Sequence, residues 1–143
     1  MGYDEFEMKS NEKFIVQGGN PMQGEITPSG NKNEALPVLA AVLLTEDPVI
    51  LHNVPDIADI RSMMDLLESL GVIIEEIGPH SLRFESCQLT HCDPDKVAAR
   101  EIRGSFLLAG PMLARYGCIR LPAPGGDRIG MRPVQTHLLA LRQ

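Results

Sequence analysis

The sequence predicts an α/β domain with mixed sheets, and two observations support that fold class. Apolar segments with helical spacing alternate with short extended segments bounded by Gly and Pro. The order helix, strand, Pro-bearing turn and helix also occurs twice, at an offset of about 70 residues, which suits a duplicated βα unit better than a solenoid. Apolar residues make up 43% of the 143 residues, which is enough for one packed core.

The chain opens with a polar stretch, residues 1–12, which we expect to be a disordered leader. Short strands are predicted at 13–16 and 24–27, separated by a Gly- and Pro-containing turn. A helix is predicted from about Lys32 to Thr45. Pro37 falls within its first turn or so, where a missing N–H does little harm.

A strand at 49–53 and a helix at about 57–70 follow. Apolar residues recur along that helix at steps of three and four, and Gly71 is the expected stop. The segments 72–77 and 81–85 are joined by a Gly-Pro-His turn, so we expect a hairpin.

The pattern then begins again. A long helical segment at about 94–116 is interrupted by glycines and Pro111 and is expected to form two helices. A strand at 118–121 leads through a Gly-rich turn into a helix from about Val134.

These segments define a first unit at about 24–86 and a second, partial unit at about 87–143. The second unit lacks the closing hairpin, and the last helix has no Gly, Asn or Pro stop signal. We therefore expect this chain to be a fragment of a longer protein.

The net charge of −6 argues against nucleic acid or an anionic membrane as a partner. The longest apolar run, 35–44, is too short to cross a bilayer, and the acidic N-terminus is unlike a signal peptide. A cytoplasmic location is expected.

The cysteines are Cys87, Cys92 and Cys118, an odd number that argues against a disulfide framework. The spacing of Cys87, His91 and Cys92 matches no common zinc site. We interpret this stretch as a loop with incidental thiols and expect no metal.

Two turns carry the residue types of an anion site. Residues 29–37 read Ser-Gly-Asn-Lys-Asn-Glu-Ala-Leu-Pro and place Lys32 and Asn33 at a helix start, where the helix dipole favours anions. Lys32 is either a solvated lysine or one that meets an anion. The anion interpretation is preferred, because the dipole makes a cation unfavourable at that position.

The second turn, residues 124–133, reads Pro-Gly-Gly-Asp-Arg-Ile-Gly-Met-Arg-Pro. Asp127 alone would be an ordinary turn aspartate, but the nearby Arg128 and Arg132 make a lid plausible. Arg103 could be a surface arginine, and only its correspondence with Lys32 singles it out. By contrast, we interpret Asp59, Arg61 and Asp65 as a solvated helix face.

In this order, residues 29–37, Arg103 and residues 124–133 resemble the UDP-N-acetylglucosamine enolpyruvyl transferases, over about 13–143. Members of that family are much longer than this chain, so the resemblance implies that residues 13–143 are the N-terminal part of such an enzyme and that its C-terminal part is the partner of this chain. The resemblance implies an inside-out α/β barrel of repeated βαβαββ units, incomplete here. It also implies transfer of the enolpyruvyl group of phosphoenolpyruvate to the sugar 3′-hydroxyl with release of phosphate, the first committed step of peptidoglycan synthesis, without a cofactor.

By the same resemblance, Lys32 and Asn33 would contact phosphoenolpyruvate, with Lys32 also in a catalytic role. The sugar-nucleotide site would be lined by Arg103, Arg132, Pro133, Val134, Gln135 and Thr136. Family members usually carry Asp-Leu where this chain has Gln135-Thr136.

Asp127 stands where most members have the cysteine that donates a proton and that fosfomycin alkylates; a minority carry aspartate. We expect Asp127 to be the acid and the enzyme to resist fosfomycin. Nearby cations favour its carboxylate form, whereas loop closure and dehydration favour the acid.

Two alternatives remain open. The shikimate-pathway enolpyruvyl transferase shares the fold and chemistry, but its usual Pro-Gly-Ser-Lys-Ser does not fit the segment from Asn33 to Pro37. The other alternative is a non-catalytic sugar-nucleotide-binding module.

Overall fold

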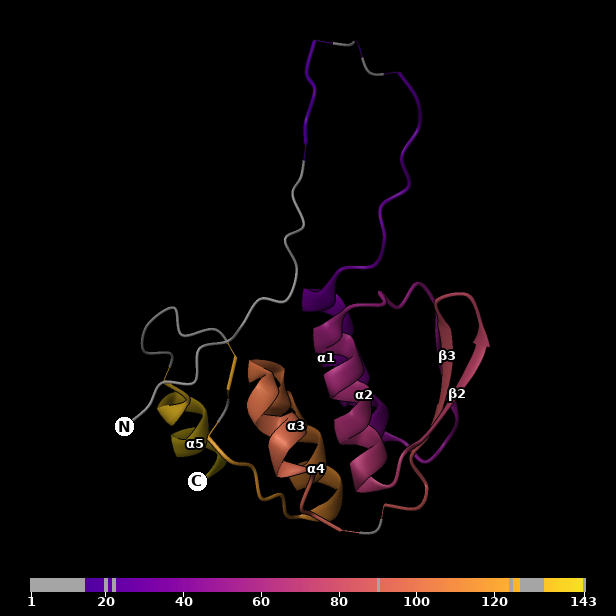
Figure 1. Ribbon diagram of the computed structural model, residues 1–143. Coiled ribbons are helices and arrows are strands. Elements are labelled where there is room, and N and C mark those ends of the chain that lie inside the picture. Colours follow the sequence, from indigo (N-terminus) through magenta and orange to yellow (C-terminus); the bar gives the residue numbers. More distant parts are fainter. Residues whose placement is uncertain are drawn as a thin grey trace.

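The computed structural model describes residues 15–19, 21, 23–89, 91–123, 125–126 and 133–142. Helices α1 and α2 lie side by side, with a small sheet against α2 and the pair α3 and α4 on the opposite side (Figure 1). The segment before α1 extends away from this body. The helices and the two 3₁₀ helices are α1 (Lys32–Ala41), η1 (Val42–Leu44), α2 (Ala58–Leu70), α3 (Lys96–Glu101), η2 (Arg103–Leu108), α4 (Ala109–Tyr116) and α5 (Gln135–Leu141).

Helix α1 begins where the sequence predicts. Asn31 adopts an extended conformation and its side chain accepts a hydrogen bond from the Asn33 N–H at 2.8 Å, which is an N-cap. Pro37 is the sixth helical residue and not a first-turn residue, so our placement was wrong. It deprives the Asn33 carbonyl of its usual helical donor, yet α1 continues into η1.

Helix α2 also confirms its prediction. Gly71 ends it in a left-handed conformation with φ 105°, which a residue without Cβ adopts at little cost. The buried face of α2 comprises Ile60, Met63, Leu66, Leu67 and Leu70. These side chains form the centre of the core together with Leu39, Leu43, Phe84, Leu108 and Met112.

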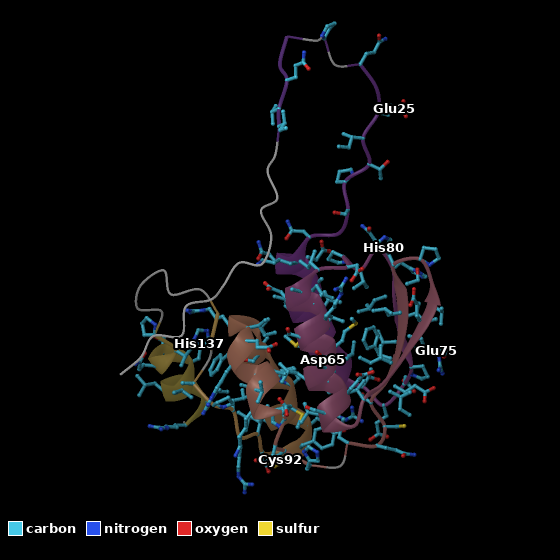
Figure 2. The ribbon with its side chains drawn as sticks, viewed as in Figure 1. Glu25, Asp65, Glu75, His80, Cys92 and His137 are labelled. Atoms are coloured by element: carbon cyan, nitrogen blue, oxygen red, sulfur yellow. A yellow bond between two sulfur atoms is a disulfide. The ribbon has the colours of Figure 1, made fainter. Side chains whose placement is uncertain are left out.

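The sheet consists of β1 (Val49–Leu51), β2 (Ile73–Gly78) and β3 (Ser81–Glu85), in the order β1-β3-β2. The predicted hairpin is confirmed, with His80 at φ 54° in its turn. Phe84 faces the core, whereas Arg83 and the opposed Glu75 form an ion pair on the outer face. Glu75 and His80 are both labelled in Figure 2.

Two predicted strands are absent from the described part of the chain. Residues 24–27 and 118–121 are not in strands, and every strand pair among the described residues is antiparallel instead of mixed. A strand needs a hydrogen-bonded neighbour, but the first segment runs away from the sheet, with Ile26 93% exposed. Ile15 and Val16 are likewise not in a strand, and residues 13–14 of that prediction lie outside the described residues.

The long helical segment is divided, as predicted, into α3, η2 and α4. The break lies at Ile102, whose backbone is extended, and η2 begins directly after it. Gly110 and Pro111 cause no break, because they are the second and third residues of α4 and fall in its first turn.

Arg115 of α4 contacts the C-terminal end of the α1–η1 segment. Its Nη1 donates hydrogen bonds to the carbonyl oxygens of Leu43 and Thr45, at 2.9 and 2.7 Å, and to Ser86 Oγ at 2.9 Å. These carbonyls end η1 and have no intrahelical donor. One guanidinium therefore caps the α1–η1 segment from a distant part of the sequence.

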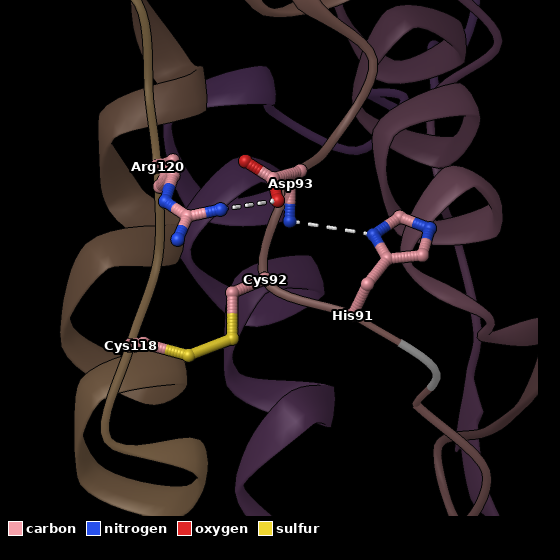
Figure 3. The surroundings of a disulfide bond; sticks show 5 residues. All are labelled: His91, Cys92, Asp93, Cys118 and Arg120. Carbon is pink, nitrogen blue, oxygen red and sulfur yellow. Dashed lines mark hydrogen bonds and ion pairs between the residues drawn. A yellow bond between two sulfur atoms is a disulfide. The ribbon is translucent and has the colours of Figure 1, made fainter.

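The cysteines correct our expectation of incidental thiols. Cys92 and Cys118 form a disulfide with a Cα–Cα distance of 5.8 Å (Figure 3). Cys87 is free and exposed. Arg120 supports the same connection, because its N–H donates to the Cys92 carbonyl at 2.9 Å and its guanidinium pairs with Asp93 at 2.9 Å. The odd number was misleading because one of the three cysteines stays unpaired.

Two further findings concern the described residues only. The described residues contain no group of three or more His, Cys, Asp or Glu side chains placed to hold a metal ion. Each of their helices is too short or too polar to span a bilayer.

Candidate active site

An open cleft of about 1010 Å³ lies where the first turns of α1 and α2 meet the junction of α3 and η2. It is lined by Lys32, Asn33, Leu36, Asp59, Arg100, Glu101, Ile102, Arg103, Gly104, Phe106, Leu107, Gly126, Val134 and His137. We call this the α1–α2 cleft. It brings together four of the predicted site residues: Lys32, Asn33, Arg103 and Val134.

Lys32 and Asp59 form an ion pair across the two helix starts. The Lys32 Nζ to Asp59 Oδ2 distance is 2.6 Å, and their side chains are 49% and 38% exposed, so both remain accessible from the cleft. Asp59 therefore does not belong to a merely solvated face, contrary to our interpretation. The sequence offered little signal for it, because 27 residues separate the partners.

Arg61 and Asp65 differ from Asp59. Arg61 pairs with Asp56 through a hydrogen bond of 2.7 Å outside the cleft, and both side chains are well exposed. The hydrogen bond and the charge of the guanidinium hold the pKa of Asp56 below its ordinary value, and Asp56 raises the pKa of Arg61. Asp65 is exposed farther along α2 (Figure 2).

At the start of α1, side chains are available to bind a ligand, whereas several backbone N–H groups are already hydrogen-bonded. The Asn33 N–H is taken by the Asn31 side chain, and the Glu34 and Ala35 N–H groups bond to the Asn31 carbonyl. An anion in the cleft would therefore be met chiefly by Lys32 and the Asn33 amide, aided by the helix dipole.

The junction of α3 and η2 supplies the opposite wall. Arg100 lies in the last turn of α3, and Arg103 begins η2 immediately after the extended Ile102. Glu101, between them, accepts a hydrogen bond from Ser62 Oγ of α2 at 3.2 Å. The cleft thus carries the cations Lys32, Arg100 and Arg103 and the carboxylates Asp59 and Glu101. Arg100 and Glu101 were not predicted.

The glycine turn packs directly against this wall. A Cβ on Gly125 would lie 1.4 Å from the Arg100 carbonyl oxygen, so only glycine fits there. Gly126 lines the cleft with φ +86°, and a Cβ on it would lie 3.2 Å from the Arg103 nitrogen. The predicted site residues Asp127 and Arg132, and Arg128 of the same turn, lie outside the described residues.

Helix α5 closes one side of the cleft. Val134 and His137 line it, and His137 is labelled in Figure 2. The His137 ring meets Phe106 edge-on, with centroids 5.6 Å apart. Pro133, Gln135 and Thr136 are exposed and are not among the lining residues. His137 was missed, although its position three residues after Val134 could have placed both on one helix face.

Comparison with known proteins identifies the class. The model of the family described as EPSP synthase (3-phosphoshikimate 1-carboxyvinyltransferase) matches residues 16–143, so the chain belongs to this family of carboxyvinyl transferases. The enolpyruvyl transferase NikO from Streptomyces tendae shares the fold. Its crystal structure gives a TM-score of 0.61 at 23% identity, over 70% of this chain and 23% of the other.

Two relatives that are more similar in sequence share one name within this class. A UDP-N-acetylglucosamine 1-carboxyvinyltransferase from Bradyrhizobium diazoefficiens is 48% identical over 92% of this chain and 30% of its own length. The enzyme of the same name from Treponema pallidum is 47% identical over 90% of this chain and 30% of its own length. The chain therefore spans about 30% of the length of these relatives.

Proposed function

We propose that the protein containing this chain transfers the enolpyruvyl group of phosphoenolpyruvate to the 3′-hydroxyl of UDP-N-acetylglucosamine and releases phosphate. The observation that carries the proposal is the gathering of Lys32, Asn33 and Arg103 in one cleft, in a chain whose relatives bear the name of that reaction. The step would belong to peptidoglycan synthesis, and both substrates are small metabolites of the cytoplasm, where we place the protein.

The charges of the cleft suit these substrates. Phosphoenolpyruvate carries a phosphate and a carboxylate, and UDP-N-acetylglucosamine carries a diphosphate. Lys32, Arg100 and Arg103 supply cations on two facing walls, so they can neutralise substrate charge and the charge that develops as the tetrahedral ketal forms and collapses. Asn33 adds a neutral donor beside Lys32. No step of this addition and elimination requires a cofactor.

The remaining assignments rest on the family resemblance. We propose Asp127 as the acid that protonates the enolpyruvyl methylene carbon. The glycine turn that precedes it is held against Arg100 and Arg103, which supports a place for this loop at the cleft. Arg132, together with residues 133–136, would contact the sugar nucleotide, and Val134 already lines the cleft.

The test is phosphate release by the complete gene product that carries this sequence. We expect release with phosphoenolpyruvate plus UDP-N-acetylglucosamine, and a loss of at least about 100-fold in kcat/KM for Arg103→Gln, in line with removal of a charge-stabilising group. Arg61→Gln is the matched control, because it removes the same kind of charge from an arginine that lies outside the cleft. If phosphate is released from phosphoenolpyruvate only when shikimate 3-phosphate is the acceptor, the protein catalyses the shikimate-pathway reaction. If phosphate is released with neither acceptor, a binding module is favoured.

Treatment with fosfomycin tests the assignment of Asp127 as the acid independently of the other site residues. We expect the wild-type protein to keep its activity after fosfomycin treatment, because a carboxylate is a poorer nucleophile toward the epoxide than a thiolate. Asp127→Cys should remain active and become sensitive to fosfomycin. Rapid inactivation of the wild type would contradict the assignment of Asp127.

A further inference from the structure

We propose that Asp59 is a positioning residue that holds the Lys32 ammonium in the α1–α2 cleft and competes there with the anionic substrate. This inference rests on the proposed function for its kinetic consequence, but its binding consequence can be measured without turnover. Its basis is the 2.6 Å ion pair between Lys32 Nζ and Asp59 Oδ2, which joins the first turns of two helices.

The helix dipoles explain why the pair has this polarity. Lys32 is the first residue of α1, where the positive end of the dipole opposes a cation. Asp59 is in the first turn of α2, where the same kind of dipole favours a carboxylate. The residue before α2, Ile57, makes no side-chain cap, so Asp59 supplies the favourable charge at that end. The dipole of α2 therefore stabilises the Asp59 carboxylate, and this carboxylate in turn stabilises the Lys32 ammonium, which the dipole of α1 disfavours.

The pair also restricts a flexible side chain. A lysine has several rotatable bonds and loses rotamer freedom when it is fixed, which costs binding energy if the substrate must do it. Because Asp59 already holds the Lys32 Nζ at the cleft wall, the Lys32 side chain loses less rotamer freedom when the substrate binds. The lysine side chain is half exposed, so an incoming phosphate can reach it while Asp59 stays in contact.

Two opposite effects follow from removing the Asp59 charge. Asp59→Asn should bind inorganic phosphate more tightly, by about fourfold, which is the Coulomb effect of one unit charge roughly 5 Å away in water. The same variant should turn over more slowly, with kcat lowered by about 10- to 100-fold, because Lys32 is no longer held in position. Asp59→Glu keeps the charge and should recover part of kcat.

The experiment compares the complete gene product with its Asp59→Asn, Asp59→Glu and Asp65→Asn variants. Asp65 provides the matched control, because it is an exposed aspartate on the same helix and its substitution changes the net charge equally. Phosphate binding is followed by NMR titration of the Asn33 side-chain amide, and kcat and KM for phosphoenolpyruvate are measured separately. Circular dichroism confirms that each variant is folded.

The expected result is tighter phosphate binding with lower kcat in Asp59→Asn, partial recovery in Asp59→Glu, and neither effect in Asp65→Asn. Equal phosphate affinity and equal kcat in wild type and Asp59→Asn would overturn the inference. A parallel loss of phosphate binding and kcat would also overturn it, because a purely structural role predicts that pattern. If the wild type shows no turnover, the proposed function fails. The phosphate titration still tests whether Asp59 competes with phosphate for Lys32.

Discussion

The Cys92–Cys118 disulfide gives a prediction whose size follows from the fold. The bond joins the loop before α3 to the segment after α4 and closes a loop with a sequence separation of 26 (Figure 3). Replacing both cysteines by serine removes this covalent link. The Arg120–Asp93 ion pair and the backbone bond from Arg120 to Cys92 remain, so the change isolates the contribution of the crosslink.

The chain-entropy model gives the magnitude. Closing a loop of this length lowers the entropy of the unfolded chain enough to stabilise the folded state by about 3.5 kcal/mol at 25 °C. For a chain of 143 residues, the unfolding entropy near 60 °C is roughly 0.3 kcal/mol/K. The double serine variant should therefore melt about 12 °C below the oxidised wild type.

Thermal unfolding followed by circular dichroism checks this prediction, with and without dithiothreitol, because cytoplasmic thiol pools also reduce disulfides. The wild type should lose the same stability on reduction, and the double variant should not respond. Cys87→Ser serves as the control, since Cys87 is free and exposed. The reasoning is refuted if the untreated wild type contains three titratable thiols, or if its midpoint equals that of the double variant.

Three further predictions concern the cleft wall, the cap of η1 and the surface. Gly125→Ala forces the turn away from the Arg100 carbonyl, so we expect a loss of about 1–3 kcal/mol in a urea titration and a raised KM; unchanged values would contradict the close approach. Arg115→Ala leaves the carbonyls that end η1 without their charged donor and should cost about 1–3 kcal/mol, and Arg115→Lys should recover only part of it. Arg61→Gln should raise the pKa of Asp56 toward its usual value of 3.8, as measured by carboxyl NMR titration. Because this pKa is depressed in the folded state, its stabilising effect is present above that value and is lost as the pH falls below it.

The helices and the hairpin could be predicted because their signals are local. Helix α2 shows an apolar face at three- and four-residue spacing and a glycine stop, and both appear in the structure. The break of the long helix was also predicted, although its position at Ile102 was not. The strands at 24–27 and 118–121 failed, because β-structure depends on a neighbour that the segment itself does not specify.

The site shows the same division. Lys32 and Asn33 could be selected from the sequence, because they lie at a recognisable helix start. Arg103 was selected only by its correspondence with Lys32 and by the family resemblance. Asp59 and Glu101 could not, since their importance comes from partners 27 and 39 residues away. The pairing of Cys92 with Cys118, and not with the nearer Cys87, was equally inaccessible to counting.

The sequence by itself determined most of the helical segments, the hairpin, the family resemblance and two cations of the proposed site, Lys32 and Arg103. Periodicity, capping residues and motif order are properties of the sequence itself, so they can be recognised without knowledge of the tertiary structure. Only the tertiary structure decided that Lys32 meets Asp59, that the glycine turn packs on Arg100, and that Arg115 caps η1. These contacts depend on how distant segments pack around one core, and packing is settled by the whole chain and not by any part of it.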